Sequence, residues 1–137
     1  IEGTFRTMDE NWRDEAHQLI RSIAGGMAES SGATIEVDIV RGYPVLQNDP
    51  MLTENCKDLA IEFLGKENVI DLDLRMTAED FAYYSQIMPA CFYRLGTRNE
   101  QKGLISNLHT PTFDVDEDSL KIGAGLMAWL AIRQLRK

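Results

Sequence analysis

Two histidines, His17 and His109, are the side chains in this sequence best suited to acid–base or metal chemistry near neutral pH. His17 lies between polar neighbours in a segment with helical periodicity, so we expect it to have a solvated or packing role. His109 stands in the sequence Asn-Leu-His-Thr-Pro, where Pro111 restricts the backbone two residues later. A rigid loop is a common place for a functional side chain, although a lone loop histidine is more often structural or merely exposed.

A complete catalytic or metal centre is not visible in the sequence. Zinc needs three or four ligands, and no second histidine, cysteine or carboxylate lies at metal-ligand spacing near His109. Nucleophile elbows and Gly-rich phosphate loops are absent from the sequence. Glu79 and Asp80 form an acidic pair that is typical of the first turn of a helix. Arg6 is able to bind a carboxylate through two hydrogen bonds, but a solvated or ion-paired arginine is the default interpretation.

Composition excludes several classes of protein. The 137 residues carry 22 acidic and 14 basic side chains, a formal net charge of −8, which disfavours nucleic acid as a partner. No run of eighteen apolar residues is present, so we expect no membrane-spanning helix. Cys56 and Cys91 are too few for a disulfide scaffold, and as buried free thiols they favour the cytoplasm. Because the chain opens with Ile1 and not with Met, we expect a fragment of a longer protein.

Residues 1–41 show the periodicities of a strand, a helix and a second strand. Residues 1–8 alternate in character, and Asp9 is a suitable N-cap for the helix that follows. Residues 33–41 alternate again and predict a half-buried strand. A Gly-Tyr-Pro sequence then interrupts the pattern, so we place a domain boundary near residues 42–48. The predicted helix between these two strands has an apolar stripe formed by Trp12, Ala16, Leu19, Ile20, Ile23, Ala24 and Met27.

The rest of the chain predicts three further helices. Asp49 as a cap, a proline at the first position and a glycine after the end predict a helix over residues 50–64. The sequence Thr-Ala-Glu-Asp at 77–80 has the form of a capping box and predicts a helix that runs to about Met88. The last helix is predicted to begin near Asp116, with acidic residues in its first turn. The segments predicted as short strands are 69–72 and 91–95.

Five motifs occur in order along the chain. They are GTFRT at 3–7, YPVLQNDP at 43–50, MTAEDFAYY at 76–84, FYRLG at 92–96 and LHTPTFDVDEDSL at 108–120. Together they resemble the C-terminal part of the metal-dependent amidohydrolase family that includes hippurate hydrolase, N-acyl-amino-acid amidohydrolases and indoleacetyl-amino-acid hydrolases. That family is close kin of aminoacylase and the zinc carboxypeptidases. The resemblance covers essentially the whole chain.

The resemblance implies an α/β fold with two parts. Residues 1–42 would be the C-terminal half of an α+β lid domain, which commonly mediates homodimerisation in this family. Residues 43–137 would be the C-terminal segment of a zinc-peptidase-like α/β catalytic domain. The boundary implied by the family agrees with the one that we placed from composition.

The resemblance also implies roles for individual residues. His109 matches the last ligand of a centre that holds two divalent ions, usually zinc or manganese. The other ligands and the general base lie in the N-terminal part of such enzymes, so no catalytic residue is expected in this segment. Asn48 and Gly96 match positions near the substrate carboxylate, and Arg6 matches the arginine of a lid strand, so all three are candidates for substrate binding. Glu79 matches a glutamate close to the active site.

The implied reaction is hydrolysis of the amide bond of N-acyl amino acids or small peptides by metal-activated water. The N-terminal part of the same enzyme would then be the partner that completes the site. We expect the isolated chain to be inactive and to bind no metal stably. Two alternatives stay open from the sequence: a non-catalytic dimerisation piece, and a small-molecule binding module built on the strand–helix–strand unit.

Overall fold

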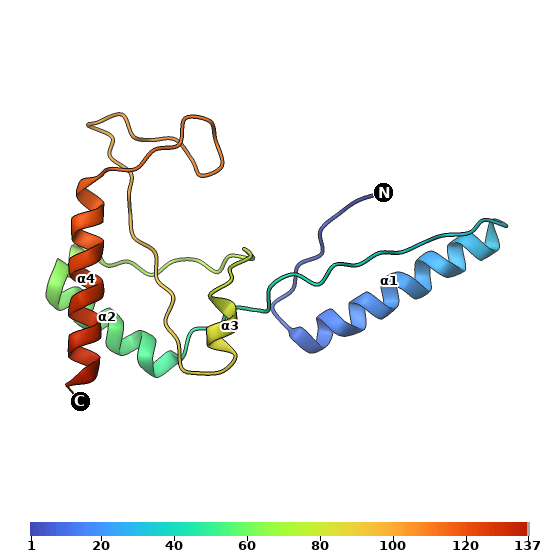
Figure 1. The fold of residues 1–137 in the computed structure, drawn as a ribbon, viewed down its shortest axis with the longest axis horizontal. Coiled ribbons are helices and arrows are strands. Elements are labelled where there is room, and N and C mark those ends of the chain that lie inside the picture. Colours follow the sequence, from blue (N-terminus) through green and yellow to red (C-terminus); the bar gives the residue numbers. More distant parts are fainter. Residues whose placement is uncertain (137) are drawn as a thin grey trace. The chain divides into compact units, whose positions relative to one another are not determined.

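The structure, a computed structural model, describes residues 1–136 (Figure 1); Lys137, the end of the predicted catalytic segment, lies outside them. The described residues form two compact units. Unit 1 consists of Ile1–Gln47 and Asp73–Pro89, and unit 2 consists of Asn48–Leu72 and the chain from Ala90 onward. The assignment of residues to a lid and a catalytic domain stays a prediction. The helices are α1 (Glu10–Ser30), α2 (Pro50–Leu64), the short 3-10 helix η1 (Lys66–Asn68), α3 (Ala82–Ser85) and α4 (Asp118–Leu135).

The caps predicted for the two helices α1 and α2 are confirmed by hydrogen bonds. The Asp9 carboxylate accepts from the N–H of Trp12 at 2.9 Å, and α1 begins directly after it. The Asp49 carboxylate accepts from the N–H of Leu52 at 2.7 Å, and α2 begins with a proline at its first position. Gly65 ends α2 with a φ of +88°, a conformation that glycine adopts at little cost. The caps therefore fix these helix ends locally.

The predicted helix from residues 77–80 to Met88 was wrong in its bounds. α3 contains only four residues, and its N-cap residue, Phe81, makes no side-chain capping bond. The N–H of Ala82 instead donates to the carbonyl oxygen of Glu79 at 3.2 Å, a tight turn that satisfies the first orphan donor. α4 also begins later than predicted, at Asp118 and not near Asp116.

The predicted strands are not formed within the described residues, which contain only one isolated antiparallel bridge, between Asn99 and Leu104. The α/β architecture expected from the sequence is thus not seen in residues 1–136. A strand needs a neighbouring backbone to complete its hydrogen bonds. Alternating side chains fix which residues share a face but not where the partner strand comes from. The segments affected are 1–8, 33–41, 69–72 and 91–95.

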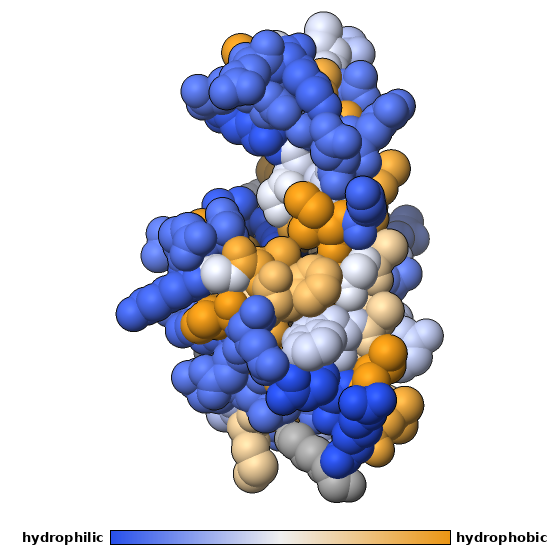
Figure 2. All heavy atoms as spheres, turned by 90° about the vertical axis from the view of Figure 1, so that its left-hand side faces the viewer, coloured by the Kyte–Doolittle hydropathy of each residue, from blue (hydrophilic) through white to orange (hydrophobic). Residues whose placement is uncertain are grey.

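Unit 2 has a small apolar core between α2 and α4. Leu59 of α2 packs with Leu126 and Leu130 of α4, and all three side chains are buried. The indole N–H of Trp129 donates to the carbonyl oxygen of Leu59 at 3.2 Å and orients the ring against α2. Figure 2 shows apolar atoms gathered over these helices, below a hydrophilic end. The side chains packed around this core are Cys56, Ala60, Leu64, Tyr93 and Trp129.

Both cysteines are free and half-buried. Cys56 packs against the α2–α4 core, and Cys91 lies in the segment that follows α3. The prediction of free thiols is confirmed, whereas their burial is only partial. No helix of the described residues is long and apolar enough to cross a bilayer. The cytoplasmic location stays a prediction.

Unit 1 leaves most of the apolar stripe of α1 exposed. Ala16 is buried, but Ile23 is 60% exposed and Met27 is 68% exposed. The amphipathic pattern predicted from the sequence is present, and within unit 1 it has no apolar layer to pack against. The other exposed members of the stripe are Trp12, Leu19 and Ile20.

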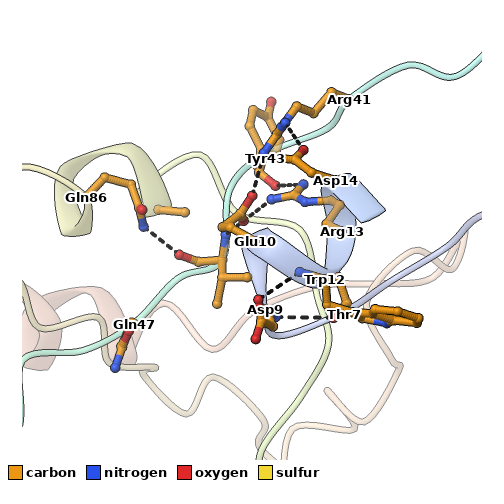
Figure 3. Close-up of polar contacts among 12 residues, drawn as sticks. Thr7, Asp9, Glu10, Trp12, Arg13, Asp14, Arg41, Tyr43, Gln47 and Gln86 are labelled. Atoms are coloured by element: carbon orange, nitrogen blue, oxygen red, sulfur yellow. Dashed lines mark hydrogen bonds and ion pairs between the residues drawn. The ribbon is translucent and has the colours of Figure 1, made fainter. Parts of the chain in front are cut away.

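Polar contacts at the first turn of α1 organise unit 1 (Figure 3). The Glu10 carboxylate accepts from the N–H of Val45 at 2.7 Å, from Arg41 at 2.9 Å, and from Arg13. Arg13 is buried, and its guanidinium also donates to the carbonyl oxygen of Tyr43 at 2.8 Å. Burial acts to raise the pKa of Glu10, and these hydrogen bonds act to lower it. The hydrogen bonds have the larger combined effect, so the pKa lies below its usual value. The segment with the predicted domain boundary is thereby tied to α1.

Candidate functional site

His109 lies in unit 2, in the loop formed by residues 105–115 that leads into α4. Its side chain is exposed, and its φ is +63°, the only positive φ at a non-glycine residue in the described part of the chain. A non-glycine residue with positive φ is uncommon and is often found at functional sites. The imidazole is therefore accessible to a ligand, and its backbone is restrained in an unusual conformation.

Side-chain hydrogen bonds cross the loop around His109. The hydroxyl oxygens of Ser106 and Thr112 lie 2.8 Å apart, on either side of the histidine. The Thr110 hydroxyl donates to the carbonyl oxygen of Asn107 at 2.8 Å. These contacts form a tight turn around the histidine.

The two ends of the loop are bound to the same stretch of chain. At the entry, Asn99 and Leu104 exchange backbone hydrogen bonds of 3.0 and 2.8 Å. At the exit, the N–H of Asp116 donates to the carbonyl oxygen of Thr97 at 2.9 Å. The loop is therefore closed at its base, like the compact surface loops whose ends lie near each other.

Three side chains reinforce this base, and we name Asn99, Lys102 and Asp116 the loop clamp. The Asp116 carboxylate accepts from the Asn99 amide at 2.6 Å and from the Lys102 ammonium at 2.6 Å. Lys102 also reaches the carboxylate of Asp118, in the first turn of α4, at 2.6 Å. The hydrogen bonds from Asn99 and then Lys102 lower the pKa of Asp116, and both carboxylates raise the pKa of Lys102.

The loop clamp was not predicted from the sequence. Asp116 was expected to start the last helix. The acidic residues from Asp116 onward were a weak sequence signal of the clamp. Lys102, fourteen residues before Asp116, contacts two of their carboxylates. Nothing in the spacing of these residues predicts that contact, which depends on the reversal of the chain between Asn99 and Leu104.

A metal is implied by the resemblance, and His109 is an exposed candidate donor for it. Among residues 1–136, no group of three or more histidine, cysteine, aspartate or glutamate side chains is placed to hold a metal ion. His109 therefore fits the role of a single ligand, and a complete centre needs donors from outside these residues. His17 lies in α1, in the other unit, and is half-buried.

Asn48 makes a paired contact with the backbone of Phe92. Its amide nitrogen donates to the Phe92 carbonyl oxygen at 2.9 Å, and its amide oxygen accepts from the Phe92 N–H at 2.8 Å. The adjacent N–H of Asp49 donates to the carbonyl oxygen of Ala90 at 2.8 Å. The Asn48 side chain thus makes the two hydrogen bonds that a residue of a neighbouring strand would make to Phe92. These bonds fix the start of α2 against the segment after α3. Its predicted role in substrate binding stays a prediction.

Gly96 lies in unit 2 and is exposed, with no atom within 4 Å of the position that a Cβ would occupy. Arg6 and Glu79 lie in unit 1. The exposed guanidinium of Arg6 donates to the carbonyl oxygen of Met76 at 3.1 Å, and Glu79 is half-buried just downstream. The structure therefore ties the segments of Arg6 and Glu79 together within unit 1. The predicted roles of these three residues in or near a substrate site are not tested by these contacts.

Comparison with known proteins identifies the family. The profile described as "Peptidase family M20/M25/M40" matches residues 3–133. The chain is 37% identical over 134 residues to thermostable carboxypeptidase 2 of Saccharolobus solfataricus, which covers 97% of this chain and 33% of that protein. It is 35% identical over 130 residues to the putative amidohydrolase YhaA of Bacillus subtilis, 95% of this chain and 33% of that protein.

A plant relative is similar over a shorter region. The chain is 42% identical over 93 residues to the IAA-amino acid hydrolase ILR1-like 6 of Arabidopsis thaliana, 68% of this chain and 20% of that protein. No solved structure matches significantly. The chain spans about a third of the length of the first two relatives. The resemblance to amidohydrolases and carboxypeptidases is confirmed, and this chain belongs to peptidase family M20/M25/M40.

Proposed function

We propose that the protein containing this chain is a metal-dependent hydrolase that cleaves the amide bond of N-acyl amino acids or small peptides. The observation that carries the proposal is the exposed imidazole of His109, in a restrained loop of a chain whose family match runs over residues 3–133. The names of the relatives, a carboxypeptidase and hydrolases of amides and amino-acid conjugates, support an amide substrate with an amino-acid leaving group.

The metal centre of the proposal contains two divalent ions, zinc or manganese. When bound, such ions lower the pKa of water and polarise a carbonyl oxygen. The part played by this chain is to present the neutral imidazole of His109 as one ligand, with its other ring nitrogen oriented by a hydrogen-bond acceptor. We assign Asn48, Gly96 and Arg6 to the substrate side and Glu79 to the vicinity of the active site.

The proposal includes the two-part architecture. Residues 1–42 belong to an α+β lid and residues 43–137 to an α/β catalytic domain. The extended segments of both parts pair with backbone outside residues 1–137, which supplies the partners that strands require. The alternating character of residues 1–8 and 33–41 supports this assignment.

The experiment is a pair of histidine variants of the intact protein. Removal of even a hydrogen-bond partner of a metal ligand costs about 10- to 100-fold in activity or affinity. We therefore expect His109→Ala to lower kcat by more than about 100-fold on N-benzoylglycine, an N-acetyl amino acid or a dipeptide. The bound metal, measured by mass spectrometry, should fall as well. His17→Ala is the matched control and should leave both quantities unchanged. Full metal content and near-normal kcat in His109→Ala would contradict the proposal.

A second candidate concerns residues 1–137 taken alone. The exposed apolar stripe of α1 and the lack of a metal-binding cluster among residues 1–136 favour a piece that dimerises without hydrolysing anything. We expect light scattering of the 137-residue chain to report a dimer and Ile23→Glu, on the exposed stripe, to shift it to monomer. Stoichiometric tight zinc bound to this chain would contradict the candidate.

A further inference from the structure

His109 has a backbone conformation that is uncommon for a residue other than glycine. Its φ of +63° is a conformation that residues with a Cβ rarely adopt. Such a conformation persists only where the surrounding structure over-determines it. The surroundings of the His109 side chain supply no such restraint, because it is exposed. The restraint must therefore come from the loop that contains it.

Hydrogen bonds hold the loop at two places, inside the loop and at its base. Inside the loop, the contact between Ser106 and Thr112 brings together the chain on either side of His109. At the base, the backbone bonds of Asn99 and Asp116 and the side chains of the loop clamp fix both ends to the stretch that includes Thr97. The inner contact is between exposed or half-buried hydroxyls. The side-chain contacts at the base involve the charged carboxylate of Asp116, which is only 14% exposed.

The loop clamp also connects the histidine loop to a rigid element. Lys102 bridges Asp116, at the end of the loop, and Asp118, at the start of α4. α4 in turn packs on α2 through the core of unit 2. Charge-assisted hydrogen bonds are shorter and stronger than those between neutral groups. The position of the loop is therefore set by α4 through the clamp.

We propose that Asn99, Lys102 and Asp116 are positioning residues that hold His109 ready to bind a divalent cation before the cation arrives. This rests on the proposed function, in which His109 is a metal ligand. A ligand side chain needs supporting residues that fix its geometry, or its affinity for the metal falls. The clamp touches neither the imidazole nor the metal, and it acts on them through the backbone of residues 105–115.

The experiment measures zinc affinity of the intact protein by titration of Zn²⁺ alone against a competing chelator. Asp116→Ala, which removes both clamp contacts, should weaken the affinity by about 10- to 100-fold, as expected for residues that support metal ligands. Lys102→Met should weaken it less, and Lys102→Arg, which keeps the charge, should restore most of it. In the same variants kcat should fall with little change in KM, and proteases should cut residues 105–115 faster.

The matched control is Arg98→Met, because Arg98 lies on the same turn and pairs with Glu100 at 3.2 Å, not with Asp116. It should keep the zinc affinity and the protease resistance of the parent. Should Asp116→Ala not fold, the comparison of Lys102→Met with Lys102→Arg carries the test. The inference is overturned if Lys102→Met and Asp116→Ala bind zinc as the control does while His109→Ala does not. If His109→Ala itself binds zinc normally, the proposed function fails, and this inference fails with it.

Discussion

The two units of this chain stabilise their helices by different means. In unit 2, α2 and α4 bury Leu59, Leu126 and Leu130 against each other. In unit 1, α1 exposes most of its apolar stripe, and its fixed contacts are the charged and polar ones around Glu10. Apolar burial supplies most of the free energy of folding, whereas polar contacts chiefly decide where the backbone lies. The comparison implies that unit 2 is the more stable part of the chain and that α1 needs a further surface to cover it.

The largest expected effect comes from the core of unit 2. Leu126 is only 4% exposed. Leu126→Ala removes the buried methine and the two methyl groups of this side chain and leaves a cavity. We expect the free energy of unfolding, measured by urea denaturation of the 137-residue chain, to fall by about 2–5 kcal/mol. Ile87→Ala in unit 1 is the control, because that side chain is 76% exposed and lies outside the apolar stripe of α1, and it should change the free energy by less than about 0.5 kcal/mol. Equal losses in the two variants would break the comparison between the units.

The next effect concerns the polar contacts of unit 1. Glu10→Ala removes the acceptor of the Val45 N–H and leaves the buried guanidinium of Arg13 without its carboxylate. We expect a loss of about 1–3 kcal/mol, seen as faster hydrogen exchange of the Val45 amide and of the first turn of α1. Asp14→Ala, which also removes a carboxylate that pairs with Arg41, should cost less because Asp14 is exposed. Unchanged exchange in Glu10→Ala would show that the polar contacts do not fix the segment.

The same carboxylate gives unit 1 an acid dependence. The pKa of Glu10 is lower in the folded chain than its ordinary value of 4.5, so the folded state binds a proton less readily than the unfolded state. Its contribution to stability is fully present above about pH 4.5 and is lost as the pH falls through the lower folded value. The protection of the Val45 amide, which is its exchange rate compared with that of an unfolded chain at the same pH, should fall over that window, and Glu10→Gln should remove the fall. An identical pH profile in Glu10→Gln would assign the effect to another group.

The smallest effect uses glycines in the helices of the two units. A Cβ at Gly25 of α1 would meet no atom within 4 Å, so Gly25→Ala should stabilise α1 by up to about 1 kcal/mol. A Cβ at Gly125 of α4 would lie 3.0 Å from the ring of Phe63 in α2, so the ring must move. We expect Gly125→Ala to gain less than Gly25→Ala, or to destabilise, in the melting temperature. A larger gain at Gly125 would show that the α2–α4 contact is looser than the structure indicates.

Several features were predictable because they depend on neighbours in the sequence. The caps Asp9 and Asp49 and the end of α2 at Gly65 were predicted at their correct positions. The helix predicted from the capping box at 77–80 begins later, at Ala82, because a turn stabilised by backbone bonds precedes α3. The family was also predictable, because five short motifs in a fixed order indicate it, and the last of these motifs contains His109.

Other features depended on contacts between distant residues. The four predicted strands are not formed, because a strand forms only beside a partner backbone, which the sequence pattern does not identify. Asn48 was a substrate candidate from resemblance, and only the structure shows that its amide pairs with the backbone of Phe92. The contact between Lys102 and Asp116 likewise requires the turn between Asn99 and Leu104.

The sequence alone determined where α1 and α2 begin, where α2 ends, which family the chain belongs to, and which imidazole is the candidate ligand. These properties follow from residue types at fixed short spacings, so no fold is needed to see them. The tertiary structure decided that α1 is uncovered within its unit, that His109 has a positive φ, and that the loop clamp fixes its loop to α4. They depend on which distant residues meet, as in the clamp, or fail to meet, as at the stripe of α1, and the free energy of such contacts is set by burial and geometry.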